Sequence, residues 1–301
     1  MTAPRIDALL TPAELQSLLA RSDLRALGVL AANFALIALA FAMVVWWPNP
    51  LTALLCIVML AGRQLGMEVL THDCAHLVLF RRRGANEFVG NWVSGALTNT
   101  SLYRYRDYHL EHHRHAGTDQ DPDLYLAQMY PAARASMRRK LLRDVTGRTG
   151  LRDTWRQLRV MRPRRNAPFL VSHALLFGCL WAVGAPWAYL LWWVAYVFVY
   201  PLITRIRYMG EHGVAIDYAS ADPRENTSST IVSWWERLLV APNRVNYHLE
   251  HHLLAGVPLY HLPRLQKLLR ERGYYGDKAC FSRGYLDVLR KATAPEETAA
   301  A

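Results

Sequence analysis

Residues 26–62 read ALGVLAANFALIALAFAMVVWWPNPLTALLCIVMLAG and contain no Asp, Glu, Lys or Arg. Residues 167–204 form a second block that is likewise free of these charged residues. Each block is about twice as long as the ~20 residues that one membrane-spanning helix needs. The two blocks predict two helical hairpins that cross a membrane, because so long an uncharged stretch is rare in the core of a soluble protein.

Both blocks carry a turn signal near the middle. The first contains Pro48-Asn49-Pro50 and the second contains Gly184-Ala185-Pro186, and both favour a turn over a continued helix. Trp46, Trp47 and Trp187 flank these turns, and indole rings favour the boundary between membrane and water. We therefore predict four spans, at about 26–47, 51–70, 168–184 and 187–204.

Positive charge is confined to the rest of the chain. The sequence carries 35 Lys and Arg, its net charge is +11, and every Lys and Arg lies in 1–25, 63–166 or 205–301. An even number of spans puts these segments on one side, and the positive-inside rule makes that side the cytoplasm. We predict a single all-α, membrane-embedded domain over residues 1–301, located in the cell inner membrane. Both termini and a helical cap, formed by 1–25, 71–166 and 205–301, would be cytoplasmic.

Three stretches outside the two uncharged blocks carry further structural signals. Thr11-Pro12-Ala13-Glu14 is typical of a capped helix start and not of a signal peptide. Residues 88–102 are apolar but too short to cross, so they lie in the interface or dip into the membrane and return. Residues 131–166 carry 12 Lys and Arg against 2 Asp. This basic segment is either a solvated inner surface or a docking surface for anionic head groups or an acidic redox partner.

The histidines point to function. Eight of the 12 fall into three clusters, which read His72-Asp-Cys-Ala-His76, His109-Leu-Glu-His112-His113 and His248-Leu-Glu-His251-His252. Residues three and four apart share one face of a helix, so each cluster presents its imidazoles together. Neutral imidazole is the commonest side-chain metal ligand. Eight imidazoles exceed what one ion can use, which predicts two metal ions.

Other polar residues near the clusters have weaker signals. His115 is expected to point away from the metal, His173 is either functional or a hydrogen-bonded structural residue, and His261 is expected at the surface. Glu111 and Glu250 stand two residues after the first histidine of their clusters, which turns them off the ligand stripe. Each would hold an imidazole by its second nitrogen or pair with an arginine. Similar supporting roles are open to Asp73 and Asn246.

The order of the clusters, with paired spans before the first and the third, resembles the integral-membrane fatty acid desaturase superfamily. That superfamily also includes alkane hydroxylases and carotenoid ketolases and hydroxylases. The resemblance covers roughly residues 25–275 and implies that the clustered histidines are iron ligands. It also implies a further ligand after the fourth span, for which Arg207-Tyr-Met-Gly-Glu-His212 offers the candidate. The metal ligands implied are His72, His76, His109, His112, His113, His212, His248, His251 and His252.

The resemblance implies two non-haem iron ions, with O2 as a co-substrate. Breaking an unactivated C–H bond needs a metal–oxygen oxidant, so no catalytic residue separate from the ligands is assigned. The sequence has no G-x-G-x-x-G fingerprint after a strand, and we therefore expect an external electron donor, a ferredoxin or small cytochrome with its reductase. The substrate would be a lipid or another long apolar molecule taken from the membrane. No nucleic-acid partner is expected.

Three functions are compatible with these patterns. The first is desaturation of a fatty-acyl chain or another lipid, which introduces a C=C bond. The second is hydroxylation or ketolation of an alkane, carotenoid or sphingoid substrate; it shares every ligand, so the clusters do not discriminate between the two. The third is a transporter or sensor that uses the histidines for Zn, Cu or Ni. It is disfavoured because the spans offer no path for an ion through the bilayer.

Overall fold

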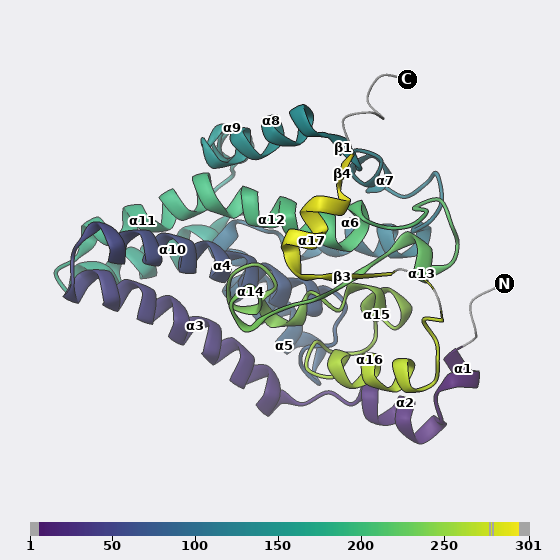
Figure 1. Ribbon diagram of the computed structural model, residues 1–301. Coiled ribbons are helices and arrows are strands. Elements are labelled where there is room, and N and C mark those ends of the chain that lie inside the picture. Colours follow the sequence, from purple (N-terminus) through teal and green to yellow (C-terminus); the bar gives the residue numbers. More distant parts are fainter. Residues whose placement is uncertain (1–5, 277, 279, 295–301) are drawn as a thin grey trace.

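The computed structural model describes residues 6–276, 278 and 280–294, and helices dominate it (Figure 1). The predicted cytoplasmic ends of the chain lie outside these residues. The helices of the first half are α1 (Ile6–Leu9), α2 (Pro12–Leu19), α3 (Asp23–Trp46), α4 (Pro50–Ala75), α5 (Arg83–Phe88), η1 (Val89–Ser94), η2 (Gly95–Thr98), α6 (Leu102–His115), α7 (Leu124–Ala127), α8 (Arg134–Val145) and α9 (Arg148–Arg159).

The second half is also helical. Its helices are α10 (Ala167–Ala182), η3 (Pro186–Ala188), α11 (Tyr189–Val194), η4 (Ala195–Val199), α12 (Tyr200–Tyr208), η5 (Met209–Gly213), α13 (Pro223–Asn226), α14 (Trp234–Leu239), η6 (Pro242–Arg244), α15 (His248–Leu253), α16 (Leu262–Glu271) and α17 (Gly284–Lys291). Short parallel pairs join β1 (Ala132–Ala133) to β4 (Thr293–Ala294) and β2 (Ser229–Ile231) to β3 (Phe281–Arg283).

Three helices of the described chain are long and apolar enough to cross a membrane. They are Asp23–Trp46, Pro50–Ala75 and the continuous run Pro186–Gly213. The segment predicted as the third span forms the shorter apolar helix α10 of 16 residues. Gly184 follows it with a φ of +76°, a left-handed conformation that ends the helix and starts the turn.

The apolar helices expose large hydrophobic side chains. Examples are Phe34 and Leu39 on α3, Leu54 on α4 and Leu175 on α10, each at least 40% exposed. Contiguous exposed apolar surface of this kind marks a membrane or protein contact. The helices α3, α10 and α11 extend to one end of the molecule, whereas α6 and α15 lie at the other (Figure 1). This distribution suggests an integral membrane protein with its histidines at one end.

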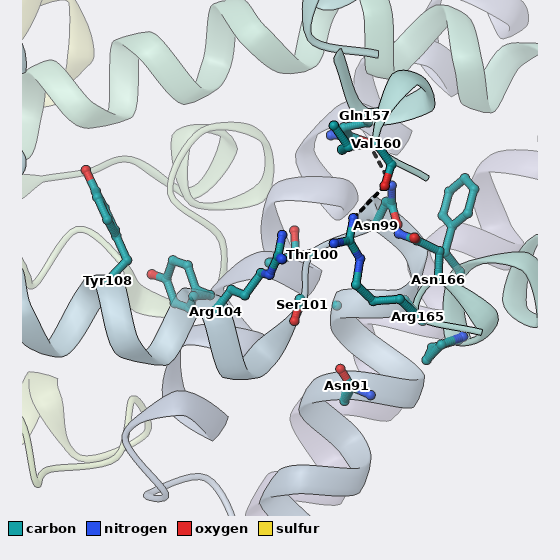
Figure 2. A pocket seen from close by; sticks show the side chains of 15 residues that line it. Asn91, Asn99, Thr100, Ser101, Arg104, Tyr108, Gln157, Val160, Arg165 and Asn166 are labelled. Carbon is teal, nitrogen blue, oxygen red and sulfur yellow. Dashed lines mark hydrogen bonds between the residues drawn. The ribbon is translucent and has the colours of Figure 1, made fainter. Parts of the chain in front are cut away.

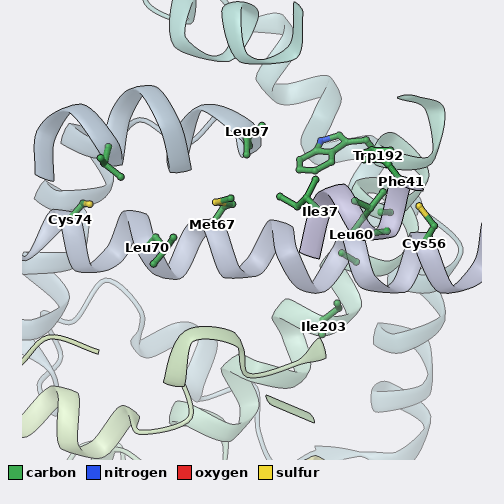
Figure 3. Packing of buried hydrophobic residues seen from close by; sticks show 14 of the residues in the cluster. Ile37, Phe41, Cys56, Leu60, Met67, Leu70, Cys74, Leu97, Trp192 and Ile203 are labelled. Atoms are coloured by element: carbon green, nitrogen blue, oxygen red, sulfur yellow. The ribbon is translucent and has the colours of Figure 1, made fainter. Parts of the chain in front are cut away.

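Side-chain caps start both helices of the first hairpin, and α3 begins at Asp23, three residues before the predicted span. The Ser22 side chain accepts a hydrogen bond from the backbone of Arg25 at the start of α3, and Asn49 caps α4 in the same way. Helices α3 and α4 pack on α11 through one buried cluster. Figure 3 shows Ile37 and Phe41 of α3 beside Trp192 of α11, above α4. Burial of these side chains fixes α4, which carries the first histidine cluster, within the bundle.

A buried arginine joins α4 to the segment before the third cluster. Arg63 donates to the Asn33 side chain at 3.0 Å and to the backbone carbonyl of Leu238. Asn243 donates to the carbonyl of Gly66 at 2.7 Å. Since a buried cation is costly without such partners, the network fixes α14 and η6 against α4. It thereby sets where the chain enters α15.

The apolar segment 88–102 does not form one regular helix. It continues α5 into the π-helical turn η1 and the 3-10 turn η2, and both turns pack against α4. The Ser94 and Thr71 hydroxyls lie 2.8 Å apart, which links η1 to α4. The segment therefore folds back along α4 and reaches α6 directly, so that α4 and α6 present their histidines to each other.

The basic segment forms the hairpin α8–α9, which packs against η4. Arg205 of α12 pairs with Asp144 of α8, whose side chain is fully buried. At Gly150 of α9, an added Cβ would lie 2.3 Å from the carbonyl oxygen of Val197. Because that neighbour is backbone, α9 can approach η4 only where residue 150 has no side chain.

Gly150→Ala is expected to destabilise the protein by about 1–3 kcal/mol, because the overlap with backbone forces α9 away from η4. The measurement is a thermal unfolding midpoint in detergent. Gly178→Ala on α10 is the matched control, since nothing lies within 4 Å of its added Cβ. Equal midpoints for the two variants would contradict this account of the α9 contact.

Candidate metal centre

Helix α4 ends in the first histidine cluster. His72 lies in its last turn and His76 is its C-cap residue, and their ring centroids are 4.8 Å apart. Helix α6 carries His109, His112 and His113 on successive turns. The imidazoles of α4 and α6 face each other, with 4.6 Å between the ring centroids of His72 and His109.

The remaining histidines come from the second half of the chain. The short helix α15 carries His248, His251 and His252. His212 lies in the π-helical turn η5, which continues the run from α11 through α12. Its ring centroid is 4.7 Å from that of His248 and 4.9 Å from that of His112. The structure thus brings together all nine histidines that the sequence analysis named.

The nine imidazoles divide into two groups, and each group could hold one ion. In each group the potential ligand atoms all lie within 4.8 Å of one another. Each of the two repeated clusters contributes to both groups. From the cluster on α6, the first and third histidines join group one and the second joins group two. From the cluster on α15, the second joins group one and the other two join group two. Group one is His72, His76, His109, His113 and His251; group two is His112, His212, His248 and His252.

The spacing of the ring nitrogens fits metal coordination. The Nε2 atom of His113 lies 3.0 Å from Nε2 of His109 and 2.9 Å from Nε2 of His251. In group two, Nε2 of His212 and Nε2 of His248 are 2.8 Å apart. Two nitrogens bound to one ion at about 2.1 Å and at a right angle would lie about 3.0 Å apart.

The chemistry of the donor set also fits. Nε2 of His76 is buried and has no hydrogen-bond partner, as expected of a nitrogen that is reserved for an ion. Burial lowers the pKa of His109, His251 and His252 well below the usual value, and the neighbouring imidazoles lower each of these pKa values further. The rings are therefore neutral and keep a lone pair for coordination.

Oxygen atoms orient several of the imidazoles through Nδ1. Nδ1 of His112 lies 2.7 Å from Oδ1 of Asp121, and Nδ1 of His212 lies 3.3 Å from the carbonyl oxygen of Asn226. Nδ1 of His72 is 3.2 Å from Oδ1 of Asp73, whereas the 3.7 Å between Nδ1 of His248 and Oε1 of Glu211 is too long for a hydrogen bond. An oxygen at Nδ1 fixes the tautomer that leaves Nε2 free for a metal.

Sequence reasoning missed two of these carboxylates. Asp121 lies in the turn after α6, and Glu211 directly precedes His212. Burial opposes ionisation of Asp121, but the hydrogen bond with His112, the backbone N–H of Asp123 and the interactions with the rings of His112 and His212 together outweigh it and lower the pKa of the carboxyl. The available signal was the acidic turn itself, Asp119-Gln120-Asp121-Pro122-Asp123, which stands close after the second cluster.

Asp121→Asn is expected to weaken metal binding by roughly 10- to 100-fold, the usual effect of losing a carboxylate behind a ligating histidine. The amide keeps the shape of the side chain but not its charge. The measurement is metal retained against a graded chelator. Asp119→Asn is the matched control, because Asp119 is exposed in the same turn. Equal retention by both variants would refute an orienting role for Asp121.

The other acidic residues have structural partners. Glu111 pairs with Arg114 and with His115, one of the two roles that were open to it. Glu250 accepts from the Ser229 hydroxyl at 2.6 Å, from Gln266 at 3.1 Å and from the Tyr275 hydroxyl, so it anchors α15 and orients no imidazole. Asn246 donates to the carbonyl of Thr230 and holds β2.

The three remaining histidines lie away from both groups. The ring nitrogens of His173 lie 2.8 Å from the Tyr189 hydroxyl and 3.2 Å from the carbonyl of Leu97, which identifies a hydrogen-bonded structural residue. His115 pairs with Glu111, as noted above. His261 lies 3.1 Å from the guanidinium of Arg25 at the exposed contact of α16 with α3.

The smallest of three neighbouring cavities borders the imidazoles. A cavity of about 120 Å³ is lined by histidines of both groups together with Tyr105 and Tyr208. It shares Tyr105 and Tyr108 with a second cavity of about 390 Å³ (Figure 2). It shares Arg207 and Tyr208 with a third, of about 420 Å³. The side chains of Tyr105 and Tyr108, and of Arg207 and Tyr208, therefore stand between the small cavity and its two larger neighbours.

The second cavity has a polar wall. Figure 2 shows Asn99 between Gln157 and Asn166, with its amide nitrogen 3.1 Å from the Gln157 side-chain oxygen. Asn166 in turn donates to the Asn99 side chain at 2.8 Å. These bonds join η2, α9 and α10, so they close this wall of the approach to the centre.

Comparison with known proteins gives a consistent result. The profile described as "Fatty acid desaturase" matches residues 45–284. The chain is 28% identical over 225 residues to a beta-carotene ketolase of Paracoccus sp. (strain PC1), an alignment that covers 73% of this chain and 81% of that protein. It is 23% identical over 274 residues to the dihydrorhizobitoxine desaturase of Bradyrhizobium elkanii, covering 81% and 75%. It is also 23% identical over 236 residues to an sn-1 oleoyl-lipid 12-desaturase of Synechocystis sp., covering 68% and 65%.

Proposed function

This chain belongs to the fatty acid desaturase family, and we propose that it uses oxygen and two iron ions to oxidise the hydrocarbon part of a lipid. The family and its desaturase and ketolase relatives identify an oxidoreductase, as the histidine pattern predicts. The observation that carries the proposal is the convergence of nine imidazoles in two groups beside a cavity.

In this proposal all nine histidines are iron ligands, five to one ion and four to the other. When bound, the ions would supply the oxidising power that breaking a C–H bond requires and that no side chain has. The side chains of the protein would orient the metal ligands and position the substrate. Asp121 and Asp73 hold His112 and His72 by Nδ1, and the cavity of about 120 Å³ would seat the reacting carbon against both groups.

The proposed setting is the cell inner membrane, with four spans and a cytoplasmic centre. The helix α10 would be the third span, shorter than the others and extended at each end by the turns that flank it. The confinement of Lys and Arg to segments outside the two uncharged blocks, 26–62 and 167–204, supports this orientation. Electrons would come from a ferredoxin or small cytochrome, and the arginines of α8 and α9 would attract an acidic donor.

We infer desaturation as the first candidate reaction, because two of the relatives compared are desaturases. A ketolase or hydroxylase reaction is the second candidate, and the beta-carotene ketolase at 28% identity favours it. Both reactions begin with removal of hydrogen from carbon at the same centre. They differ in whether a second hydrogen is lost or an oxygen atom is added.

Lipid mass spectrometry of a bacterial host that expresses the chain tests the proposal. Loss of two hydrogens from a host lipid would identify desaturation, and gain of oxygen would identify hydroxylation or ketolation. Cells that express the His251→Ala variant are the control, because this change removes one imidazole of group one. A purified protein that binds zinc stoichiometrically and acts without oxygen would overturn both candidates.

A further inference from the structure

One acidic residue of an apolar helix, Glu68, lies close to the candidate centre but contacts none of its imidazoles in the hydrogen bonds and ion pairs described above. Glu68 belongs to α4, which is long and apolar enough to cross a membrane. It precedes His72 by four residues, so the carboxylate and the imidazole stand on one face of the helix, about 5–6 Å apart along it. An ionisable residue in such a helix is costly, and it usually serves function.

Hydroxyl groups surround this carboxylate. The Thr100 hydroxyl donates to Oε1 of Glu68 at 3.1 Å. The side chains of Tyr200 and Thr98 also form hydrogen bonds with Glu68. All four residues line the cavity of about 420 Å³ that shares Arg207 and Tyr208 with the cavity beside the imidazoles. Glu68 therefore faces a cavity that is next to the one beside the imidazoles, and not a closed protein core.

The charges in this cavity limit what it can bind. Three guanidinium groups line the same space, and each pairs with a carboxylate: Arg152 with Asp153, Arg205 with Asp144 and Arg207 with Glu211. A cationic ligand would meet these guanidinium groups, and an anionic ligand would meet the carboxylate of Glu68. An uncharged group that both donates and accepts hydrogen bonds meets neither penalty. It could donate to Glu68, whose carboxylate accepts several hydrogen bonds, or to the hydroxyl oxygen of Tyr200 or Thr100, whose own hydrogens are directed at Glu68.

We propose that Glu68, with Tyr200 and Thr100, binds an uncharged hydroxyl group of the substrate. The inference rests on the proposed function, since it names the class of molecule that this centre oxidises: a long chain or ring that carries an alcohol a few carbons from the reacting position. The alternative role for Glu68 is to balance the charge of bound metal ions.

Binding of two probes to the purified full-length chain tests the proposal without turnover. The probes are tritiated hexadecan-1-ol and tritiated hexadecane, measured by scintillation proximity on immobilised, iron-loaded protein without reductant. We expect hexadecan-1-ol to bind roughly 10- to 100-fold more tightly than hexadecane, the range for a hydrogen bond to a charged group. Equal binding of the two probes to the unaltered protein would overturn the proposal.

Three variants separate the explanations. Glu68→Leu is expected to lose the preference for the alcohol and keep its iron, whereas Glu68→Gln keeps part of the preference because the amide still accepts a hydrogen bond. Thr100→Val is expected to reduce the preference in a protein whose carboxylate is intact. Glu271→Gln is the matched control for the loss of one charge, since Glu271 is half exposed on α16 and pairs with Lys267.

Loss of iron in Glu68→Leu, with the preference for the alcohol intact, would overturn the proposal in favour of charge balance. The result for the proposed function is separate. If the unaltered protein prefers hexadecan-1-ol but oxidises no lipid with oxygen and a reductant, the hydroxyl site is supported and only the proposed reaction is overturned.

Discussion

Replacing His112 with alanine is expected to lower lipid oxidation by roughly a thousandfold or more, beyond the 10- to 100-fold typical of losing a residue that only supports a ligand. Nε2 of His112 lies 3.3 Å from Nε2 of His252, and its Nδ1 is held by Asp121. Group two has four imidazoles, so the change leaves three and also frees the carboxylate that oriented the fourth. The bound iron should fall from two ions per chain towards one.

The measurements are iron per chain by mass spectrometry and oxidised product per chain. His115→Ala is the matched control, because His115 lies on the same helix and pairs with Glu111 outside both groups. The control should keep both irons and its activity. A His112→Ala protein that retained two irons and full activity would show that group two is not a metal site.

Acid is expected to destabilise the metal-free protein steeply below about pH 6.5. The pKa of five histidines outside the apolar helices is lowered. Burial is the larger cause, and repulsion by neighbouring imidazoles and arginines is the smaller one. The folded protein therefore does not take up the protons that these residues bind in the unfolded chain below their usual pKa of about 6.5. Stability is complete above that pH and is lost as the pH falls through it. The five are His109, His113, His248, His251 and His252.

Each of these histidines contributes about 1.4 kcal/mol per pH unit to the slope, so the five together contribute up to about 7 kcal/mol per pH unit. The measurement is the free energy of unfolding of chelator-treated protein between pH 7.5 and 5.5, values chosen to lie about one unit either side of the usual histidine pKa. His113→Gln should lower the slope by about one histidine's share. A free energy that does not change over this range would contradict the burial of neutral imidazoles.

The sequence predicted the features that depend on local pattern. Uncharged blocks predicted the apolar helices, and the spacing of His72 from His76 predicted that both rings would leave α4 on one side. The capping signal at Thr11 predicted the start of α2, where Thr11 and Glu14 form a capping box. The family profile confirms the predicted family. These features follow from residues within one or two helical turns.

Features that depend on contacts between distant segments were not predictable in the same way. Each repeated cluster was expected to present its three imidazoles together, yet His112 and His113 belong to different groups. Adjacent residues point about 100° apart on a helix, and only the position of α15 decides which ring meets which partner. Similarly, no local pattern specifies the π-helical turns η1, η4 and η5, or the contact of Asp121 with His112.

Each group of imidazoles combines histidines from both halves of the chain, and this has a consequence for biosynthesis. Group one needs His251 as well as His72, and group two needs His112 together with three residues from the second half of the chain. Group one cannot be complete before residue 251 is synthesised, nor group two before residue 252, and by then both uncharged blocks, the second of which ends at residue 204, have been synthesised. If the two groups hold the proposed ions, full coordination of either ion has to follow synthesis of the apolar helices.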